Sequence, residues 1–170
     1  GGTNVKTFPL DQFEDVFRAV SSKKIKRGII PIENALTGSI HQNFDLLVKY
    51  KVWITSEVKI RIEHHLVSPK LLELKDIREI HSHPQALGQC GKFINKLKSA
   101  RAVPAFDTAG AILDIQKNKI SNAAAIASKS AAKYYGMKIL ANKIADDEQN
   151  FTRFFVIEDA RTKQRSKVAN

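Results

Sequence analysis

A hydroxyl and a fixed positive charge stand side by side at Thr152 and Arg153, directly before the apolar run Phe154–Ile157. The aromatic and β-branched residues of that run predict a covered β-strand, which places Thr152 and Arg153 where the chain leaves a loop. A positioned hydroxyl can donate a hydrogen bond to a leaving oxygen, and an arginine can hold a carboxylate by paired hydrogen bonds. The alternative is an ordinary strand start with a solvated arginine, because one Thr-Arg pair specifies no chemistry.

Small polar residues recur where expected strands end and helices begin, and a helix N-terminus offers free N–H groups and positive potential. These junctions together predict a cradle for a small anion. The alternative at each junction is a simple N-cap, as expected of Ser39 for the helix that follows it. The four junctions are Asn34–Ser39, Ser82–Gln85, Asp107–Thr108 and Ala127–Ser128.

The elements that position these residues alternate between strand and helix, which predicts an α/β fold with largely parallel pairing. The extended stretch Val52–Val67 is long enough to pass between two lobes. Near the N-terminus, Asn4–Phe8 is expected to be a short strand, and Asp11 with Glu14 has the spacing of a capping box. Further strands are expected at Gly28–Ile32, Ile77–Ile80, Ala102–Phe106, Ala123–Ala127 and Lys138–Ile144, and helices after Pro84, Asp107 and Ser128.

Histidine and cysteine offer little further chemistry. His64 and His65 are neighbours on an expected strand and so point to opposite faces, which disfavours a metal site. His81 and His83 have a His-x-His spacing, but no third ligand is placed to complete a zinc site. Cys90, the single cysteine, is expected to be a small buried hydrophobe on a helix rather than a nucleophile.

The 170 residues suffice for one domain or one two-lobed module with a core. No apolar run approaches the length of a membrane span, and the first residues lack a signal-peptide core, so a cytoplasmic protein is expected. The net charge of +11 falls to +7 over residues 1–159, because a basic tail, residues 161–170 and expected to be disordered, carries four of the 28 basic residues. A basic surplus of this kind favours anionic ligands weakly.

Taken together, five motifs in order resemble the catalytic domain of the prephenate dehydratase family. The resemblance runs from about Phe13 to Ile157 and implies a two-lobed fold similar to the type 2 periplasmic binding proteins, with lobe 1 at about residues 1–60 and 148–160, lobe 2 at about 61–147, and the active cleft between them. The motifs are Pro31-Ile32-Glu33-Asn34 with Gly38-Ser39, Ser82-His83-Pro84-Gln85-Ala86-Leu87, Asp107-Thr108-Ala109-Gly110-Ala111, Ala124-Ala125-Ile126-Ala127-Ser128 with Tyr135-Gly136, and Asn150-Phe151-Thr152-Arg153-Phe154.

By this resemblance the activity is the conversion of prephenate to phenylpyruvate, water and carbon dioxide in phenylalanine biosynthesis. Plant-type relatives prefer arogenate. Expulsion of the ring hydroxyl needs a proton donor, and rearomatisation drives the step, so no cofactor or metal is expected. Thr152 matches the family's threonine and is the expected donor, while Arg153 either holds a substrate carboxylate or organises the cleft from outside. Substrate contacts are expected from Asn34, Ser39, Ser82, Gln85 and Thr108.

Two departures from the family pattern bear on this reading. Gly1-Gly2-Thr3-Asn4 stands in place of the family's opening strand and Gly-rich motif, and Ala35 stands where the family usually has Ser or Thr. No ACT domain is expected after the dehydratase-like segment, which removes feedback by phenylalanine through such a domain. A homodimer or larger homo-oligomer is expected, because a missing strand leaves a sheet edge open.

Two other classes remain open from the sequence. One is a small-anion binding module of the same fold with weakened or lost turnover. The other is a nucleic-acid-binding protein, which rests on charge alone because the chain has no recognised nucleic-acid motif.

Overall fold

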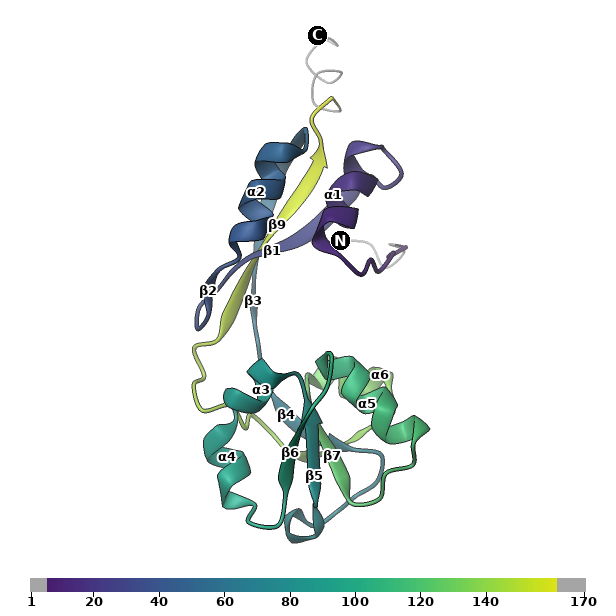
Figure 1. Cartoon of the computed structure of the whole chain (residues 1–170), viewed down its shortest axis with the longest axis vertical. Helices are drawn as coiled ribbons and strands as arrows, with labels where there is room; N and C mark the ends of the chain where they lie inside the picture. The colour runs from purple at the N-terminus through teal and green to yellow at the C-terminus, as the bar shows by residue number, and fades with distance from the viewer. Residues whose placement is uncertain (1–5, 162–170) are drawn as a thin grey trace. The chain divides into compact units, whose positions relative to one another are not determined.

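The computed structural model describes residues 6–161, which divide into two compact units (Figure 1). In the described chain, unit 1 comprises residues 6–61 and 151–161, and unit 2 comprises residues 62–150. The chain therefore crosses from unit 1 to unit 2 after Arg61 and returns after Asn150. Both units pack helices against a β-sheet, so the expectation of a two-lobed α/β fold is confirmed. The strand expected at Asn4–Phe8 begins outside the described residues, and residues 6–8 are not in a strand.

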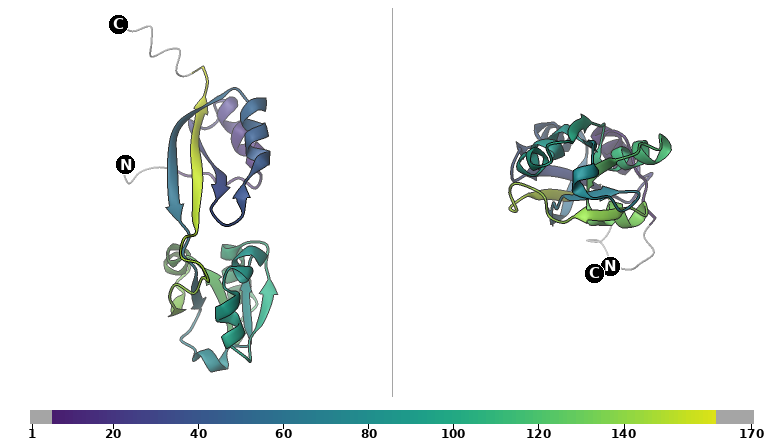
Figure 2. Two further views of the ribbon diagram at one scale, coloured as in Figure 1. Left: turned by 90° about the vertical axis from the view of Figure 1, so that its left-hand side faces the viewer. Right: turned by 90° about the horizontal axis from the view of Figure 1, so that it is seen from below.

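Unit 1 is a four-stranded antiparallel sheet in the order β2-β1-β9-β3 with two helices. Figure 2 shows α1 and α2 on the same side of this sheet. The elements are α1 (Phe13–Ser21), β1 (Arg27–Asn34), β2 (Gly38–Ser39), α2 (His41–Lys49), β3 (Val52–Arg61) and β9 (Phe151–Asp159). Two register shifts occur in this sheet, between Pro31 and Glu33 of β1 and between Ile54 and Ser56 of β3.

The core of unit 1 forms where the helices meet the central strands. Phe17 and Val20 of α1 and Leu46 of α2 pack against Ile30 and Ile157. The close approach of α1 requires glycine at position 28, because a Cβ there would lie 2.7 Å from a methyl carbon of Val16.

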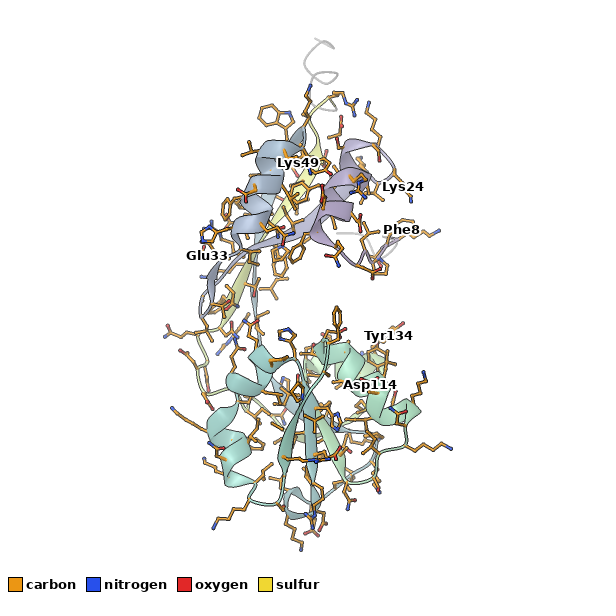
Figure 3. The ribbon with its side chains drawn as sticks, in the orientation of Figure 1. Phe8, Lys24, Glu33, Lys49, Asp114 and Tyr134 are labelled. Carbon is orange, nitrogen blue, oxygen red and sulfur yellow. The ribbon has the colours of Figure 1, made fainter. Side chains whose placement is uncertain are left out.

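A polar contact joins α1 to the end of α2. Glu14 accepts hydrogen bonds from Lys49 Nζ at 2.7 Å and from the Tyr50 hydroxyl at 2.8 Å, and Lys49 is labelled in Figure 3. The bond from Lys49 lowers the pKa of Glu14. The expected capping box of Asp11 and Glu14 is therefore wrong: α1 is preceded by Gln12, whose side chain makes no capping bond.

Unit 2 is a five-stranded mixed sheet in the order β6-β5-β7-β4-β8. One face packs in a core with α3 and α4, and the other packs with α5 and α6. Its central strand β7 is buried throughout. The elements are β4 (His65–Ser68), the 3₁₀ turn η1 (Leu74–Asp76), β5 (Glu79–Ser82), α3 (Pro84–Gly88), α4 (Gly91–Lys96), β6 (Arg101–Pro104), α5 (Thr108–Lys117), β7 (Ala123–Ala127), α6 (Lys129–Tyr134) and β8 (Lys138–Ala141).

The expectation of largely parallel strand pairing is wrong, because most strand pairings in the described chain are antiparallel. Within the described chain only β5 pairs in parallel, with β6 and with β7, and the other five pairings are antiparallel. The reason is the path of the chain, because β3 and β9 carry it in opposite directions between the units and therefore pair antiparallel. The long stretch Val52–Val67 is interrupted after Arg61, so it forms β3 and β4 rather than one strand.

Among residues 6–161, no helix has the length and the apolar character that a membrane crossing needs. At the C-terminal end, Arg161, the first residue of the expected basic tail, is held in place. Its guanidinium donates to both carboxylate oxygens of Asp159 and to the Ser21 carbonyl. The rest of that tail lies outside the described residues.

Candidate active site

Asn34 and Thr152, which are 118 positions apart in the chain, form a hydrogen-bonded pair in unit 1. The antiparallel register of β1 with β9 sets them directly opposite each other. Asn34 Nδ2 donates to Thr152 Oγ1 at 2.9 Å and also lies 3.3 Å from the Phe151 carbonyl oxygen. Each of the two residues is 9% exposed, so the pair is almost fully removed from solvent.

The orientation of the Asn34 amide follows from its other contacts. Its Oδ1 accepts from the backbone N–H of Leu36 at 3.0 Å and of Thr37 at 3.2 Å, and the Thr37 hydroxyl lies at 3.3 Å. These donors require the oxygen to face the loop between β1 and β2, a local arrangement typical of asparagine. The amide N–H groups are thereby directed at Thr152.

The chemical state of Thr152 follows from that direction. A threonine hydroxyl has one proton to donate and lone pairs that accept. Because Asn34 donates to Thr152 Oγ1, the oxygen accepts in this contact and the hydroxyl proton stays available. Within residues 6–161, no acceptor for that proton is found among the hydrogen bonds. A polarised hydroxyl with an available proton is what a hydrogen-bond donor to a leaving group requires.

Arg153 is held by carboxylates of its own unit. Its Nε lies 3.6 Å from Glu33 Oε2 and 3.7 Å from Glu57 Oε1, and its guanidinium lies 5.7 Å from the centre of the Phe155 ring. Glu33 is directly opposite Arg153 in the β1–β9 register, near the β1–β2 hairpin (Figure 3). Between the two roles expected for Arg153, these contacts favour organising the strands over binding a substrate carboxylate.

Ser39 does not cap the helix that follows it. It belongs to β2, where it pairs with Glu33, and it is exposed. The position before α2 is occupied by Ile40, which makes no side-chain capping bond. The expected capping role of Ser39 is therefore wrong, because the short hairpin to β1 extends the chain through this residue.

In unit 2, Ser82 is the last residue of β5 rather than part of the junction after it, whereas Gln85 follows the strand in α3. Ser82 is fully buried and its hydroxyl donates to the Ile126 carbonyl oxygen at 2.9 Å. Its proton is therefore engaged inside the sheet. Gln85 is exposed in the first turn of α3, where its backbone N–H donates to Nδ1 of His83, the N-cap residue.

The N-termini of α5 and α6 are capped as the sequence predicted. Asp107 Oδ1 accepts from the N–H groups of Ala109 at 2.8 Å and Gly110 at 2.6 Å, and Ser128 Oγ accepts from Ala131 at 3.1 Å. Thr108 is half-buried at the first position of α5. The start of α5 thus already holds the carboxylate of Asp107, which opposes a second anion at the same N–H groups.

The remaining histidine and cysteine residues are engaged separately. His81 Nε2 lies 2.8 Å from Glu79 Oε2, and the hydrogen bonds of Arg101 and His81 lower the pKa of Glu79. Within residues 6–161, no three His, Cys, Asp or Glu side chains gather in an arrangement that could hold a metal ion. Cys90 is fully buried, as expected, and burial with the nearby charge of Asp146 raises the pKa of its thiol to about 12.

One buried polar cluster was missed by the sequence reasoning. His64 Nε2 and Asn150 Nδ2 lie 2.8 Å and 3.0 Å from Gln89 Oε1. Asn150 belongs to the Thr152 motif, which was a signal, but the sequence held no indication that His64 and Gln89 approach it. Their positions depend on how the segment that enters unit 2 after Arg61 and the segment that leaves it after Asn150 come together within unit 2.

Over most of its length the chain is similar to proteins of one family. A model of the prephenate dehydratase family matches residues 2–162. Arogenate dehydratase/prephenate dehydratase 2 of Arabidopsis thaliana is 42% identical over 154 residues, which are 91% of this chain and 40% of that protein. The chain thus spans about two fifths of the length of the curated relatives it matches.

Two solved structures are similar to the chain. Prephenate dehydratase from Arthrobacter aurescens, solved in complex with L-Phe, has a TM-score of 0.79 at 27% identity and covers 88% of this chain and 50% of its own. GqqA, described as a novel type of quorum-quenching acylase, has a TM-score of 0.81 at 30% identity, with coverage of 92% and 56%.

Proposed function

This chain belongs to the prephenate dehydratase family, and on that premise we propose that it converts prephenate to phenylpyruvate, water and carbon dioxide. The observation that supports the proposal most is the buried pair of Asn34 and Thr152. It leaves the Thr152 hydroxyl polarised and its proton available for a leaving oxygen. In the cell this activity belongs to phenylalanine biosynthesis.

The reaction loses the ring hydroxyl and the ring carboxylate together. The carboxylate leaves as carbon dioxide, its electron pair forms the aromatic ring, and the hydroxyl leaves as water with a proton taken up. Thr152 contributes a hydrogen bond that strengthens as negative charge builds on the leaving oxygen, which lowers the barrier more than it strengthens substrate binding. Asn34 donates to Thr152 Oγ1, so this oxygen accepts and the hydroxyl proton of Thr152 is directed away from Asn34.

The other side chains have supporting roles in this proposal. Arg153, held between Glu33 and Glu57, fixes the start of β9. Ser39, Ser82, Gln85 and Thr108 remain the proposed contacts for the substrate. Among these, Ser82 is the weakest candidate for binding a carboxylate, because its proton is engaged by Ile126 and only lone pairs remain.

Arogenate is the second candidate substrate, and the names of the plant relatives favour it. Arogenate and prephenate share the ring that undergoes the reaction and differ only at the side chain, where arogenate has an ammonium in place of the keto oxygen. The chemistry assigned to Thr152 is the same for both substrates. The choice between them depends on the groups that meet this side chain.

The test is turnover of each substrate by the purified chain, followed as phenylpyruvate from prephenate and phenylalanine from arogenate. In Asn34→Asp, a carboxylate would accept the Thr152 proton while still accepting from Leu36 and Thr37. We expect turnover to fall by roughly 10²-fold, the range for losing a positioned proton donor, with the fold kept.

Asn118→Asp adds the same charge at an exposed position after α5 and should keep full turnover. Binding of either substrate without turnover would replace the dehydratase by a binding module. Hydrolysis of an acyl amide without dehydration of either substrate would favour an acylase instead.

A further inference from the structure

A β-bulge in β1 decides which of its side chains meets Thr152. Between Pro31 and Glu33 the register of β1 with β9 shifts by one residue, and Ile32 is the extra residue on β1. After this shift Asn34 lies opposite Thr152. Without it, the register that holds up to Pro31 would continue and would place Glu33 opposite Thr152.

These two registers differ in what they do to the Thr152 hydroxyl. The Asn34 amide donates to Thr152 Oγ1 at 2.9 Å, which leaves the hydroxyl proton available. An ionised carboxylate only accepts, so Glu33 in the same place would bind that proton instead. The bulge therefore decides whether Thr152 can act as a donor in the proposed reaction.

Two carbonyl groups of the bulge are held by the segment that leads into α2. Asn43 Nδ2 donates to the Pro31 carbonyl at 2.7 Å, and the Ile40 N–H donates to the Ile32 carbonyl at 2.8 Å. Because a carbonyl oxygen only accepts, the nitrogen of the Asn43 amide is the atom that faces Pro31. A bulge interrupts the ladder between two strands, so its carbonyl groups depend on partners outside β9.

The Asn43 side chain is a polar group inside an apolar core. It is fully buried, and within the described residues its Oδ1 makes no hydrogen bond. A buried amide with one unpaired atom destabilises a core relative to an apolar side chain of the same size. The core cluster of this unit includes Ile32 and Leu46, and packing against them does not require an amide. The bond to Pro31 is what an apolar residue at position 43 could not supply.

We propose that Asn43 is a positioning residue that holds the β-bulge of β1 and thereby keeps Asn34, rather than Glu33, opposite Thr152. The inference rests on the proposed function of Thr152. Asn43 touches no reacting atom, because it acts through the Pro31 carbonyl and the backbone of β1. All of these residues belong to unit 1.

The test begins with Asn43→Leu, which keeps the approximate size of the side chain and removes the donor. Ser68→Ala is the matched control, because Ser68 is buried in unit 2 and its hydroxyl donates to the Ala123 carbonyl at 3.0 Å. We measure steady-state kinetics with prephenate and arogenate, and amide hydrogen exchange of Ala35. The Ala35 N–H donates to the Phe151 carbonyl at 2.8 Å, a bond that depends on the shifted register.

In Asn43→Leu, exchange at Ala35 should quicken by about fivefold or more, the equivalent of one net hydrogen bond. Exchange at Tyr50, whose N–H donates to the Leu46 carbonyl at the end of α2, should not change. The kcat should fall by a similar factor with KM within about twofold, because the Thr152 hydroxyl acts mainly in the transition state. Ser68→Ala should alter neither exchange at Ala35 nor kcat.

Three results would overturn the role of Asn43. One is unchanged exchange at Ala35 in Asn43→Leu, whatever the activity. Another is faster exchange at Ala35 with unchanged kcat, because the bulge would then not govern Thr152. The third is an equal change at Ala35 and Tyr50, which would assign Asn43 to the stability of α2 instead.

If Asn43→Leu does not fold, Asn43→Thr and Asn43→Val replace it, because these two side chains have the same shape and only threonine has a donor. Exchange at Ala35 should be slower in Asn43→Thr than in Asn43→Val, and equal exchange contradicts the proposal. A wild-type chain without dehydratase activity would remove the proposed function, and exchange at Ala35 would still decide whether Asn43 holds the bulge.

Discussion

Replacing the Thr152 hydroxyl by a methyl group separates its chemical role from its structural role. In Thr152→Val the side chain keeps its shape and its place in β9, and the bond from Asn34 Nδ2 at 2.9 Å is lost. The amide still has the Phe151 carbonyl at 3.3 Å, so it is not left without a partner. The free energy of unfolding should therefore fall by only about 1 kcal/mol, the net value of one hydrogen bond.

The effect on turnover should be larger than the effect on stability. Loss of a positioned proton donor lowers turnover by roughly 10²-fold, which corresponds to about 2.7 kcal/mol of barrier. We expect kcat to fall by this factor with KM within about twofold, because the hydroxyl acts mainly in the transition state. Thr152→Ser keeps the hydroxyl and should recover most of the rate.

The assay is phenylpyruvate or phenylalanine formation beside urea unfolding of the same samples. Thr55→Val is the control, because the Thr55 hydroxyl donates to the Val156 carbonyl at 3.2 Å in the same sheet. It should lose a comparable amount of stability and keep its kcat. Turnover by Thr152→Val at the wild-type rate would refute the assignment of Thr152 as the donor.

Three further predictions concern stability, reactivity and assembly. The hydrogen bonds of Arg161 lower the pKa of Asp159 from its ordinary 3.8, so their stabilisation is present above that value and is lost as the pH falls through the lowered pKa. Arg161→Gln should therefore lower the urea midpoint at about pH 7 more than at about pH 2, and an equal shift at both would contradict this pairing. The Cys90 thiol, fully buried with its pKa raised to about 12, should react with a thiol reagent only after unfolding, and rapid modification of the folded protein would show that unit 2 opens readily. Within the described sheet of unit 1, one edge of β1 pairs with β9, and its other edge pairs with β2 only at Glu33 and Asn34. We predict a homodimer through the rest of that second edge, because an open strand edge can pair with another chain. Light scattering should return about twice the chain mass of 19.0 kDa, and a monomer at micromolar concentration would contradict the dimer.

Local features of this protein were predictable because they depend on residues a few positions apart. Asp107 and Ser128 cap the helices that follow them, since a short polar side chain can reach the free N–H groups of the first turn. Pro84 starts α3, and the apolar run after Arg153 becomes the strand β9. The placement of Thr152 at the start of that strand, and hence its candidacy as a functional residue, followed from the same local pattern.

Local rules failed where a distant partner competed for the same group. Glu14 had the spacing of a cap, but Lys49 and Tyr50 of the neighbouring helix bind its carboxylate instead. Ser39 had the chemistry of an N-cap, but pairing with Glu33 draws it into a strand. Each of these residues can either cap a helix or pair with a distant partner. The sequence did not reveal that the distant partner would be near.

The sequence by itself determined the type of most elements and the residues that carry chemistry, because apolar periodicity and capping act within one or two turns. Only the tertiary structure decided that the hydroxyl of Thr152 meets the amide of Asn34, and that Gln89 joins His64 to Asn150. Strand register sets these contacts between residues far apart in the chain. Register depends on the burial of whole strands and on register shifts such as the one between Pro31 and Glu33, which exist only once the sheet has assembled.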